Sequence, residues 1–63
     1  MTHTLLRIED VAGMTGIPVA TLRFWRHEGR GPHSAKLGRR VVYRLSDVEA
    51  WIDEQFETAA ASK

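Results

Sequence analysis

The sequence predicts one small domain that is mainly α-helical with a single β-hairpin, in the order α-α-β-β-α. Apolar residues recur at helical spacing in three short segments, and a Gly-Ile-Pro tripeptide separates the first two. Before the third segment the hydrophobic period changes to that of strands. The 63 residues leave room for one domain only, which we place over residues 1–63 with an ordered core of about 5–57.

The first expected helix starts near Leu5, and its apolar face consists of Ile8, Val11, Ala12 and Met14. Gly16-Ile17-Pro18 ends it, because glycine suits a C-terminal cap and proline does not continue a helix. Proline is tolerated at a helix start, so Pro18 also opens the second helix, over about residues 19–28.

On the second helix, Leu22 and Trp25 are three residues apart and are expected to face the core, whereas Arg23, Arg26 and His27 project elsewhere. Two short helices joined by a glycine-containing turn are typical of a helix-turn-helix motif, and the same spacing also suits an ordinary helical corner. The arginines favour the motif, since they lie on the helix that enters the major groove in such proteins.

The next segment reads as a hairpin, with strands at residues 34–37 and 41–44 and the loop Gly38-Arg39-Arg40 between them. An isolated hairpin is only marginally stable in water, so this one should pack on the helices. The contacts are expected through Ala35, Leu37, Val41 and Tyr43. Two arginines at the tip then reach outward, in the manner of a wing beside a helix-turn-helix.

The last expected helix starts at Ser46, which forms a capping box with Glu49, and it continues to about Glu57. Its apolar stripe consists of Val48, Trp51, Ile52 and Phe56. Thr58 to Lys63 are expected to form a frayed tail. We expect Trp25 and Trp51 to belong to the core rather than to stack on bases, because both lie on apolar helical faces.

Charge is strongly segregated along the chain although the net charge is only +1. Residues 23–44 hold seven cationic side chains, six of them arginine, against Glu28 alone. Residues 45–63 hold five acidic side chains against Lys63. A basic stripe of this kind is the electrostatic footprint of a nucleic-acid-binding protein, the alternative being a solvated basic surface.

Other classes of protein are disfavoured. The chain has no cysteine, and His3, His27 and His33 are scattered, so we expect no metal site, no cofactor and no small-molecule ligand. No pocket for catalysis is expected at this size, and we do not expect an enzyme. No apolar run is long enough to span a membrane, so a cytoplasmic location is expected.

The order of elements and several short motifs together resemble the small winged helix-turn-helix proteins of the excisionase, MerR-like and AlpA-like group. The resemblance extends from about Leu5 to Ile52. The motifs that carry it are Val11-Ala12, Gly16-Ile17-Pro18, Thr21-Leu22-Arg23-Phe24-Trp25-Arg26, Gly29-Arg30-Gly31-Pro32, Lys36-Leu37-Gly38 and Tyr43-Arg44 through Ser46-Asp47-Val48-Glu49-Ala50-Trp51-Ile52. The chain departs from the group at Arg7 and Pro18, where serine or threonine is usual. Each departure weakens N-capping by about 0.5–2 kcal/mol.

The resemblance implies sequence-specific binding of double-stranded DNA, with the second helix in the major groove and the wing on the backbone or minor groove. By similarity the contacts on and after that helix are Thr21, Arg23, Phe24, Arg26, His27 and Arg30, and those on the wing are Lys36, Arg39 and Arg40. From the residues alone, the Thr21 hydroxyl suits a hydrogen bond within its own helix as well as it suits a phosphate contact. Phe24 is offset from Leu22 and Trp25, so the spacing does not decide whether its ring is buried or exposed near the DNA groove.

Two functions compete within the group. An excisionase binds repeated sites beside a phage attachment site, bends the DNA and directs an integrase towards excision. A small transcriptional regulator occupies a promoter instead. MerR-type regulators generally carry a long dimerisation helix after the DNA-binding part, and the end of this sequence at Lys63 therefore favours the excisionase.

The charge map also predicts head-to-tail self-association along DNA, in which the acidic side chains of the last helix meet the basic wing of a neighbour. The residues expected to make this contact are Asp53, Glu54 and Glu57. The alternative from a different class is a protein-interaction module without DNA binding, which would use Trp51 and Phe56 as a hydrophobic anchor.

Overall fold

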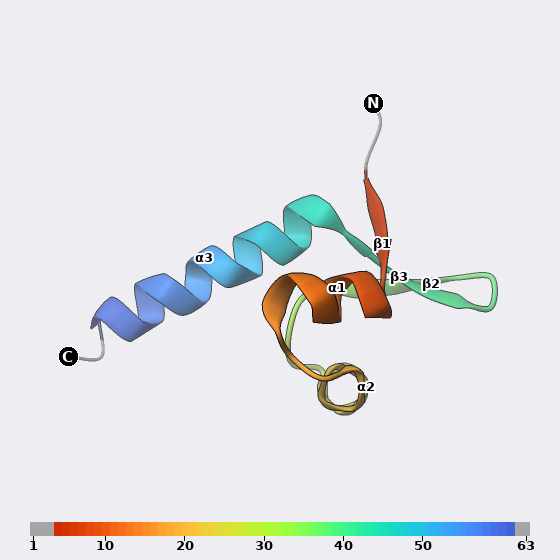
Figure 1. The fold of residues 1–63 in the computed structure, drawn as a ribbon, viewed down its shortest axis with the longest axis horizontal. Helices are drawn as coiled ribbons and strands as arrows, with labels where there is room; N and C mark the ends of the chain where they lie inside the picture. Colours follow the sequence, from red (N-terminus) through yellow and green to blue (C-terminus); the bar gives the residue numbers. More distant parts are fainter. Residues whose placement is uncertain (1–3, 62–63) are drawn as a thin grey trace.

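The computed structural model describes residues 4–61 (Figure 1). Its elements are β1 (Leu5–Arg7), α1 (Ile8–Thr15), α2 (Val19–Glu28), β2 (Ser34–Leu37), β3 (Arg40–Arg44) and α3 (Leu45–Ala61). The mainly α-helical class with a β-hairpin, and the order helix, helix, hairpin, helix, are confirmed. In Figure 1 the C-terminal end of α3 projects well beyond α1 and α2.

The sheet contains a strand that the sequence did not predict. Its order is β1-β3-β2, with both outer strands antiparallel to β3. Leu5 and Leu6 were expected to enter the first helix, but they pair with Arg44 and Tyr43 instead. Three residues are too few to show an alternating pattern, and this strand exists only because β3 supplies a partner from a distant part of the sequence.

The turn between α1 and α2 is confirmed in detail. Gly16 adopts a left-handed conformation with φ 75°, and its N–H donates to the carbonyl oxygen of Ala12 at 2.8 Å. The Thr15 hydroxyl donates to the carbonyl oxygen of Val11 and accepts a bond from the Ile17 N–H. The Gly16 bond satisfies the Ala12 carbonyl, and the Thr15 hydroxyl satisfies the Ile17 N–H, so the chain that leads from α1 into α2 is fixed by hydrogen bonds.

The N-terminus of α1 compensates for the missing serine or threonine. The Arg7 backbone N–H donates to Oδ2 of Asp10 at 2.9 Å, which is the carboxylate half of a capping box. Arg7 itself has no side-chain capping bond. The expected weakening of the cap is therefore offset in part by Asp10, which also lies in the first turn, where a negative charge is favoured.

The core contains one fully buried side chain from each of four elements. Val11 of α1, Leu22 of α2, Tyr43 of β3 and Val48 of α3 are all at most 2% exposed. Partly buried side chains surround them: Leu6, Ile8, Ala12, Ile17, Trp25, Val41 and Ile52. Each helix and the central strand are thus attached to a single small core.

Four apolar residues expected in the core are exposed. Ala35 and Leu37 of β2 are paired with Val42 and Arg40, so they lie on the face of the sheet opposite to Val41 and Tyr43. Leu37 is 53% exposed. Met14, at 46%, and Phe56, at 73%, lie at the ends of α1 and α3, where helical spacing continues past the edge of the core. These four predictions were wrong.

α3 differs from its prediction at both ends. It begins at Leu45, so Ser46 lies in the first turn and not at the cap position from which it was expected to pair with Glu49. Instead, Nε of Arg44 donates to Oδ2 of Asp47 at 2.9 Å, and the Leu45 N–H donates to the Thr4 carbonyl oxygen.

At its other end α3 continues past Glu57, so the described part of the expected tail, residues 58–61, is helical. In residues 4–61 we find no helix with the length and apolar character needed to cross a membrane.

The hairpin turn is shorter than expected. Arg40 belongs to β3 and pairs with Leu37, which leaves Gly38 and Arg39 as a two-residue loop. Gly38 has φ 64°. A positive φ at the first position of a two-residue loop matches the twist of the flanking strands and favours glycine there. Arg39 is thereby held at the outer tip of the wing.

Candidate nucleic-acid interface

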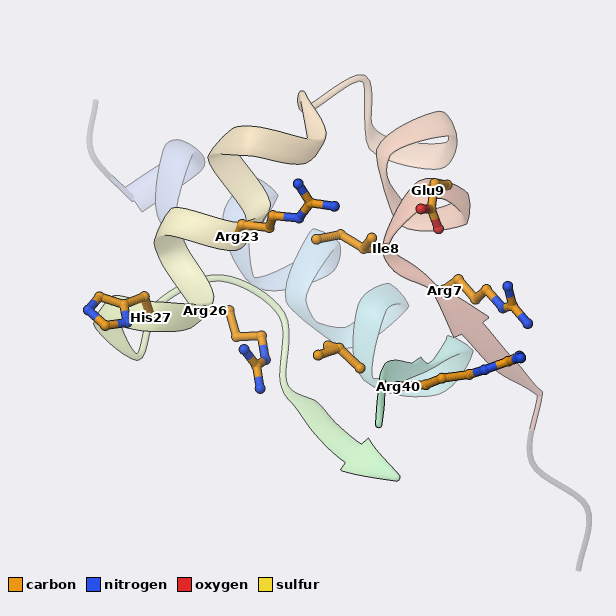
Figure 2. Close-up of a pocket in the computed structure, with 8 residues that line it drawn as sticks. Arg7, Ile8, Glu9, Arg23, Arg26, His27 and Arg40 are labelled. Carbon is orange, nitrogen blue, oxygen red and sulfur yellow. The ribbon is translucent and has the colours of Figure 1, made fainter. Parts of the chain in front are cut away.

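A groove of about 520 Å³ runs between α2, the start of α1 and the sheet, and most of the side chains around it are cationic. Figure 2 shows the groove with its lining residues. The lining consists of Arg7, Ile8, Glu9, Arg23, Arg26, His27, Arg40 and Val41. The lining thus contains four arginines and one histidine but only one carboxylate, and Ile8 and Val41 are its apolar part.

α2 contributes three of these side chains. Arg23, Arg26 and His27 are spaced by three and four residues, so they project from one side of the helix. All three are exposed. Leu22 on the other side is buried and holds the helix on the core. The predicted contacts Arg23, Arg26 and His27 are therefore brought together on one exposed helical surface.

Two further arginines come from the sheet. Arg40 opens β3, and Arg7 ends β1, where it is paired with Val42. In Figure 2 their side chains extend in the same direction, at the side of the groove away from His27. Arg7 was not among the predicted contacts. No local pattern could have indicated it, because it reaches the groove only through the pairing of β1 with β3.

The four groove guanidinium groups have no carboxylate partner. Within residues 4–61, no ion pair involves Arg7, Arg23, Arg26 or Arg40. Two other arginines are paired: Arg30 with Glu28 at 3.5 Å, and Arg44 with Asp47 at 2.9 Å. The unpaired groups keep their full capacity for bidentate bonds to phosphate or to guanine edges.

Arg26 lies on the side of the groove near the buried Tyr43 of the core. Burial raises the pKa of the Tyr43 hydroxyl, and the charge of Arg26 opposes this rise. The guanidinium group is thus close enough to act on the buried tyrosine. Arg26 also lines a smaller hollow of about 250 Å³ with Arg30 and His33, so the basic surface continues past the end of α2.

Phe24 and Arg30 lie apart from the main groove. The Arg30 guanidinium carbon is 5.8 Å from the centre of the Phe24 ring and 5.9 Å from that of Trp25. Cation–π contacts of this kind stabilise an exposed arginine by about 0.5–1 kcal/mol. Phe24 is 52% exposed. Neither residue lines the groove that contains Arg23 and Arg26.

The remaining predicted contacts are spread over the domain. Lys36 on β2 and Arg39 in the hairpin turn are both exposed, and neither lines the groove. Thr21 on α2 is half-buried. The acidic residues Asp53, Glu54 and Glu57 are exposed on α3. These three acidic residues therefore lie on a different element from those that line the basic groove.

The part of the chain described by the structure contains no group of three or more histidine, aspartate or glutamate side chains that could hold a metal ion. His27 lines the groove and His33 the smaller hollow. His3 lies outside the described residues.

Comparison with known proteins identifies the family. The model of a helix-turn-helix domain matches residues 5–55, which is most of the chain. No curated protein and no solved structure shows a significant match. The matched region contains α1, the turn, α2, the hairpin and the first part of α3, so it includes the whole groove. The chain therefore belongs to the helix-turn-helix domain family, a small family of DNA-binding proteins that includes excisionase-like and AlpA-like members.

Proposed function

We propose that this protein is an excisionase, a recombination directionality factor of a phage or mobile element. It binds repeated sites in attachment-site DNA, bends the DNA and directs an integrase towards excision. It acts as a single winged-helix domain on double-stranded DNA in the bacterial cytoplasm, associated with the nucleoid. It needs no cofactor and catalyses no reaction of its own.

The groove with its four unpaired arginines is the observation that supports DNA binding most directly. The major groove of B-DNA is about 12 Å wide and admits an α-helix. α2 presents Arg23, Arg26 and His27 on its exposed side. We assign these three to the major groove, and Arg7, Arg39 and Arg40 to the flanking phosphates. Lys36, Thr21, Phe24 and Arg30 are assigned to the edges of the same interface.

A salt series with random-sequence duplex DNA tests this proposal. A slope of log affinity against log salt of about −4 to −6 is expected, because roughly five or six phosphates are neutralised. Arg23→Ala and Arg39→Ala should each weaken binding. Arg44→Ala is the matched control, since it removes the same charge from a side chain already paired with Asp47. Absence of binding at low salt would exclude a DNA-binding function.

Excision is favoured over promoter binding by the separation of charge between the groove and α3. Copies bound at adjacent repeats bring the acidic α3 of one near the basic wing of the next, which suits contiguous binding. Energy transfer between fluorophores at the ends of a duplex containing two selected sites should show bending. In a recombination assay with the element's integrase, adding this protein should increase the yield of the excision product. Binding without bending or excision would favour a transcriptional regulator.

A protein-interaction module is the competing class, and one observation favours it. Phe56 on α3 is 73% exposed, and it does not line the basic groove. Such a module predicts no affinity for DNA and no effect of changes at Arg23 or Arg26. The salt series with Arg23→Ala therefore separates the two classes directly.

A further inference from the structure

We propose that the loop between α2 and β2 holds one backbone phosphate of the DNA in a basic hollow of about 250 Å³ beside the main groove. The phosphate is bound by Arg30, His33 and Ser34, and Arg26 forms the wall that the hollow shares with the groove. This inference deepens the proposed function and rests on it, because it takes DNA as the partner.

The polar side chains around the hollow are all hydrogen-bond donors, and no carboxylate lines it. Arg26 and Arg30 carry positive charge, the His33 ring carries an N–H, and the Ser34 hydroxyl donates a further hydrogen. Within residues 4–61, neither the His33 ring nor the Ser34 hydroxyl forms a hydrogen bond. A phosphate of the DNA backbone is negatively charged and only accepts hydrogen bonds, so it matches this set of donors.

The Glu28 carboxylate does not cancel the charge of the hollow. Its Oε1 is 3.5 Å from Nη2 of Arg30, both side chains are exposed, and Glu28 does not line the hollow. An exposed ion pair of this length is weak, and it leaves the other N–H groups of the guanidinium available. Arg26 has no ion pair within residues 4–61. The hollow therefore keeps an excess of positive charge.

Contacts within the fold hold the loop in place before any ligand binds. The Arg30 N–H donates to the Trp25 carbonyl oxygen at 2.7 Å, and the Arg30 guanidinium carbon lies 5.9 Å from the centre of the Trp25 ring. Pro32 is buried, and Gly31 packs closely on Trp25. A site that its own scaffold keeps in position loses less conformational entropy on binding.

The C-terminal end of α2 lies beside the hollow, and a helix C-terminus by itself repels anions. Here the carbonyl oxygens of Trp25 and Arg26 accept bonds from the N–H groups of Arg30 and Gly29. The last turn of α2 also carries Arg26 and His27. The capped carbonyl groups and the cationic side chains thus offset the repulsion.

Continuity with the main groove favours DNA as the source of the phosphate. Arg26 lines both the groove and the hollow, so the two basic surfaces join. A strand whose phosphates follow α2 along the groove therefore continues to the loop. Free inorganic phosphate offers the same oxygen atoms without this continuity, and it is the alternative that the experiment must exclude.

Methylphosphonate substitution tests the inference on a duplex that contains one selected site. Each backbone phosphate in turn is replaced by an uncharged methylphosphonate, and fluorescence anisotropy measures the affinity. At one position the replacement should weaken wild-type binding about tenfold, as loss of a charge-assisted contact implies. The same replacement should weaken Arg30→Ala less than about threefold, because its main contact to that phosphate is already missing. Its effect on Ser34→Ala should also be smaller than on the wild type.

Arg23→Ala and Ser46→Ala are the matched controls, because neither residue lines the hollow. Both should show the full effect of the replacement at that position. A variant that only disturbs the fold loses affinity for the two duplexes equally, so it does not imitate the coupling. In a nuclear magnetic resonance titration, the duplex should shift the His33 ring signals and displace any inorganic phosphate.

DNA binding in which Arg30 and Ser34 are coupled to different phosphates, or to none, would overturn the inference and leave the proposed function intact. Inorganic phosphate that stays bound at the His33 ring when the duplex is added would have the same meaning. Absence of DNA binding by the wild-type protein would overturn the proposed function itself. The two failures are thus distinguishable.

Discussion

Trp25 of α2 and Trp51 of α3 pack against each other, with ring centroids 5.8 Å apart and planes tilted by 50°. Both rings are half-buried, and the contact joins α2 to the C-terminal helix. The predicted role of both residues in packing is consistent with this arrangement, since tilted aromatic pairs contribute about 0.5–1.5 kcal/mol beyond the area they bury.

We therefore expect Trp51→Ala to lower the free energy of unfolding by about 2–3 kcal/mol, somewhat less than the ~3–5 kcal/mol typical of a fully buried aromatic residue. Phe56→Ala on the same helix should cost about 0.5 kcal/mol or less, because its ring is mostly in water. Urea unfolding followed by circular dichroism measures both. Equal losses would show that the Trp25–Trp51 contact contributes little to the fold.

Two glycines in similar conformations should respond differently to substitution. Gly29 and Gly31 have φ 75° and 81°, which costs an L-residue about 1–2 kcal/mol. A Cβ added to Gly29 meets nothing within 4 Å, whereas one added to Gly31 lies 3.0 Å from Cε3 of Trp25. Gly31→Ala should therefore destabilise by about 1 kcal/mol more than Gly29→Ala in urea unfolding. The reverse order would contradict the close approach of Gly31 to the Trp25 ring.

Arg7 should take part in DNA binding although it lies on a strand before the helix-turn-helix. We expect Arg7→Ala to weaken binding about tenfold at low salt and to reduce the salt slope by about one, as loss of a charge-assisted phosphate contact implies. Arg7→Lys should keep the slope, because the charge is retained. Fluorescence anisotropy over a salt series measures both effects. An unchanged slope for Arg7→Ala would place Arg7 outside the interface.

The stability of the domain should fall at alkaline pH because of Tyr43, the only tyrosine of the chain. Burial raises the pKa of its hydroxyl above 10.0, and the Arg26 charge only opposes that rise. The unfolded chain therefore loses this proton at a lower pH than the folded chain. The contribution of the buried tyrosine to the free energy of unfolding is thus intact below pH 10 and is lost as the pH rises further. Urea unfolding of Tyr43→Phe should lack this fall. Parallel pH profiles for the two proteins would contradict the prediction.

Reversing the acidic charges of α3 should remove cooperativity without weakening binding to a single site. We expect the triple variant Asp53→Lys, Glu54→Lys, Glu57→Lys to bind an isolated site as tightly as the wild type, or more tightly. Its binding to two adjacent sites should be non-cooperative, because the attraction to the neighbour's basic wing is replaced by repulsion. Gel-shift titrations on one-site and two-site duplexes compare the two. Unchanged cooperativity would exclude these side chains from the contact between copies.

The boundaries predicted correctly from the sequence are those that local chemistry determines. Gly16 and Pro18 end one helix and begin the next, and Gly29 ends α2 in the left-handed conformation. Each signal acts within a few residues of the boundary it sets, so no knowledge of the fold is needed. The clustering of Arg23, Arg26 and His27 follows equally from helical spacing alone.

The features that were missed depend on distant residues. β1, and with it the position of Arg7, exists only through pairing with β3. Ser46 lost its expected capping role because β3 leads directly into α3, which begins one residue earlier. Hydrophobic spacing placed Phe56 and Leu37 on apolar faces, but it carries no information on where the core ends.

The pairing of Leu5 with Arg44 also orders events during synthesis. The strand made first has no partner until residues 42–44 of β3 have been translated, and the groove is incomplete until then. Because β3 is central, neither the helical pair nor the hairpin reaches its final environment alone. The basic groove is therefore assembled late, because its lining comes from both ends of the segment between β1 and β3.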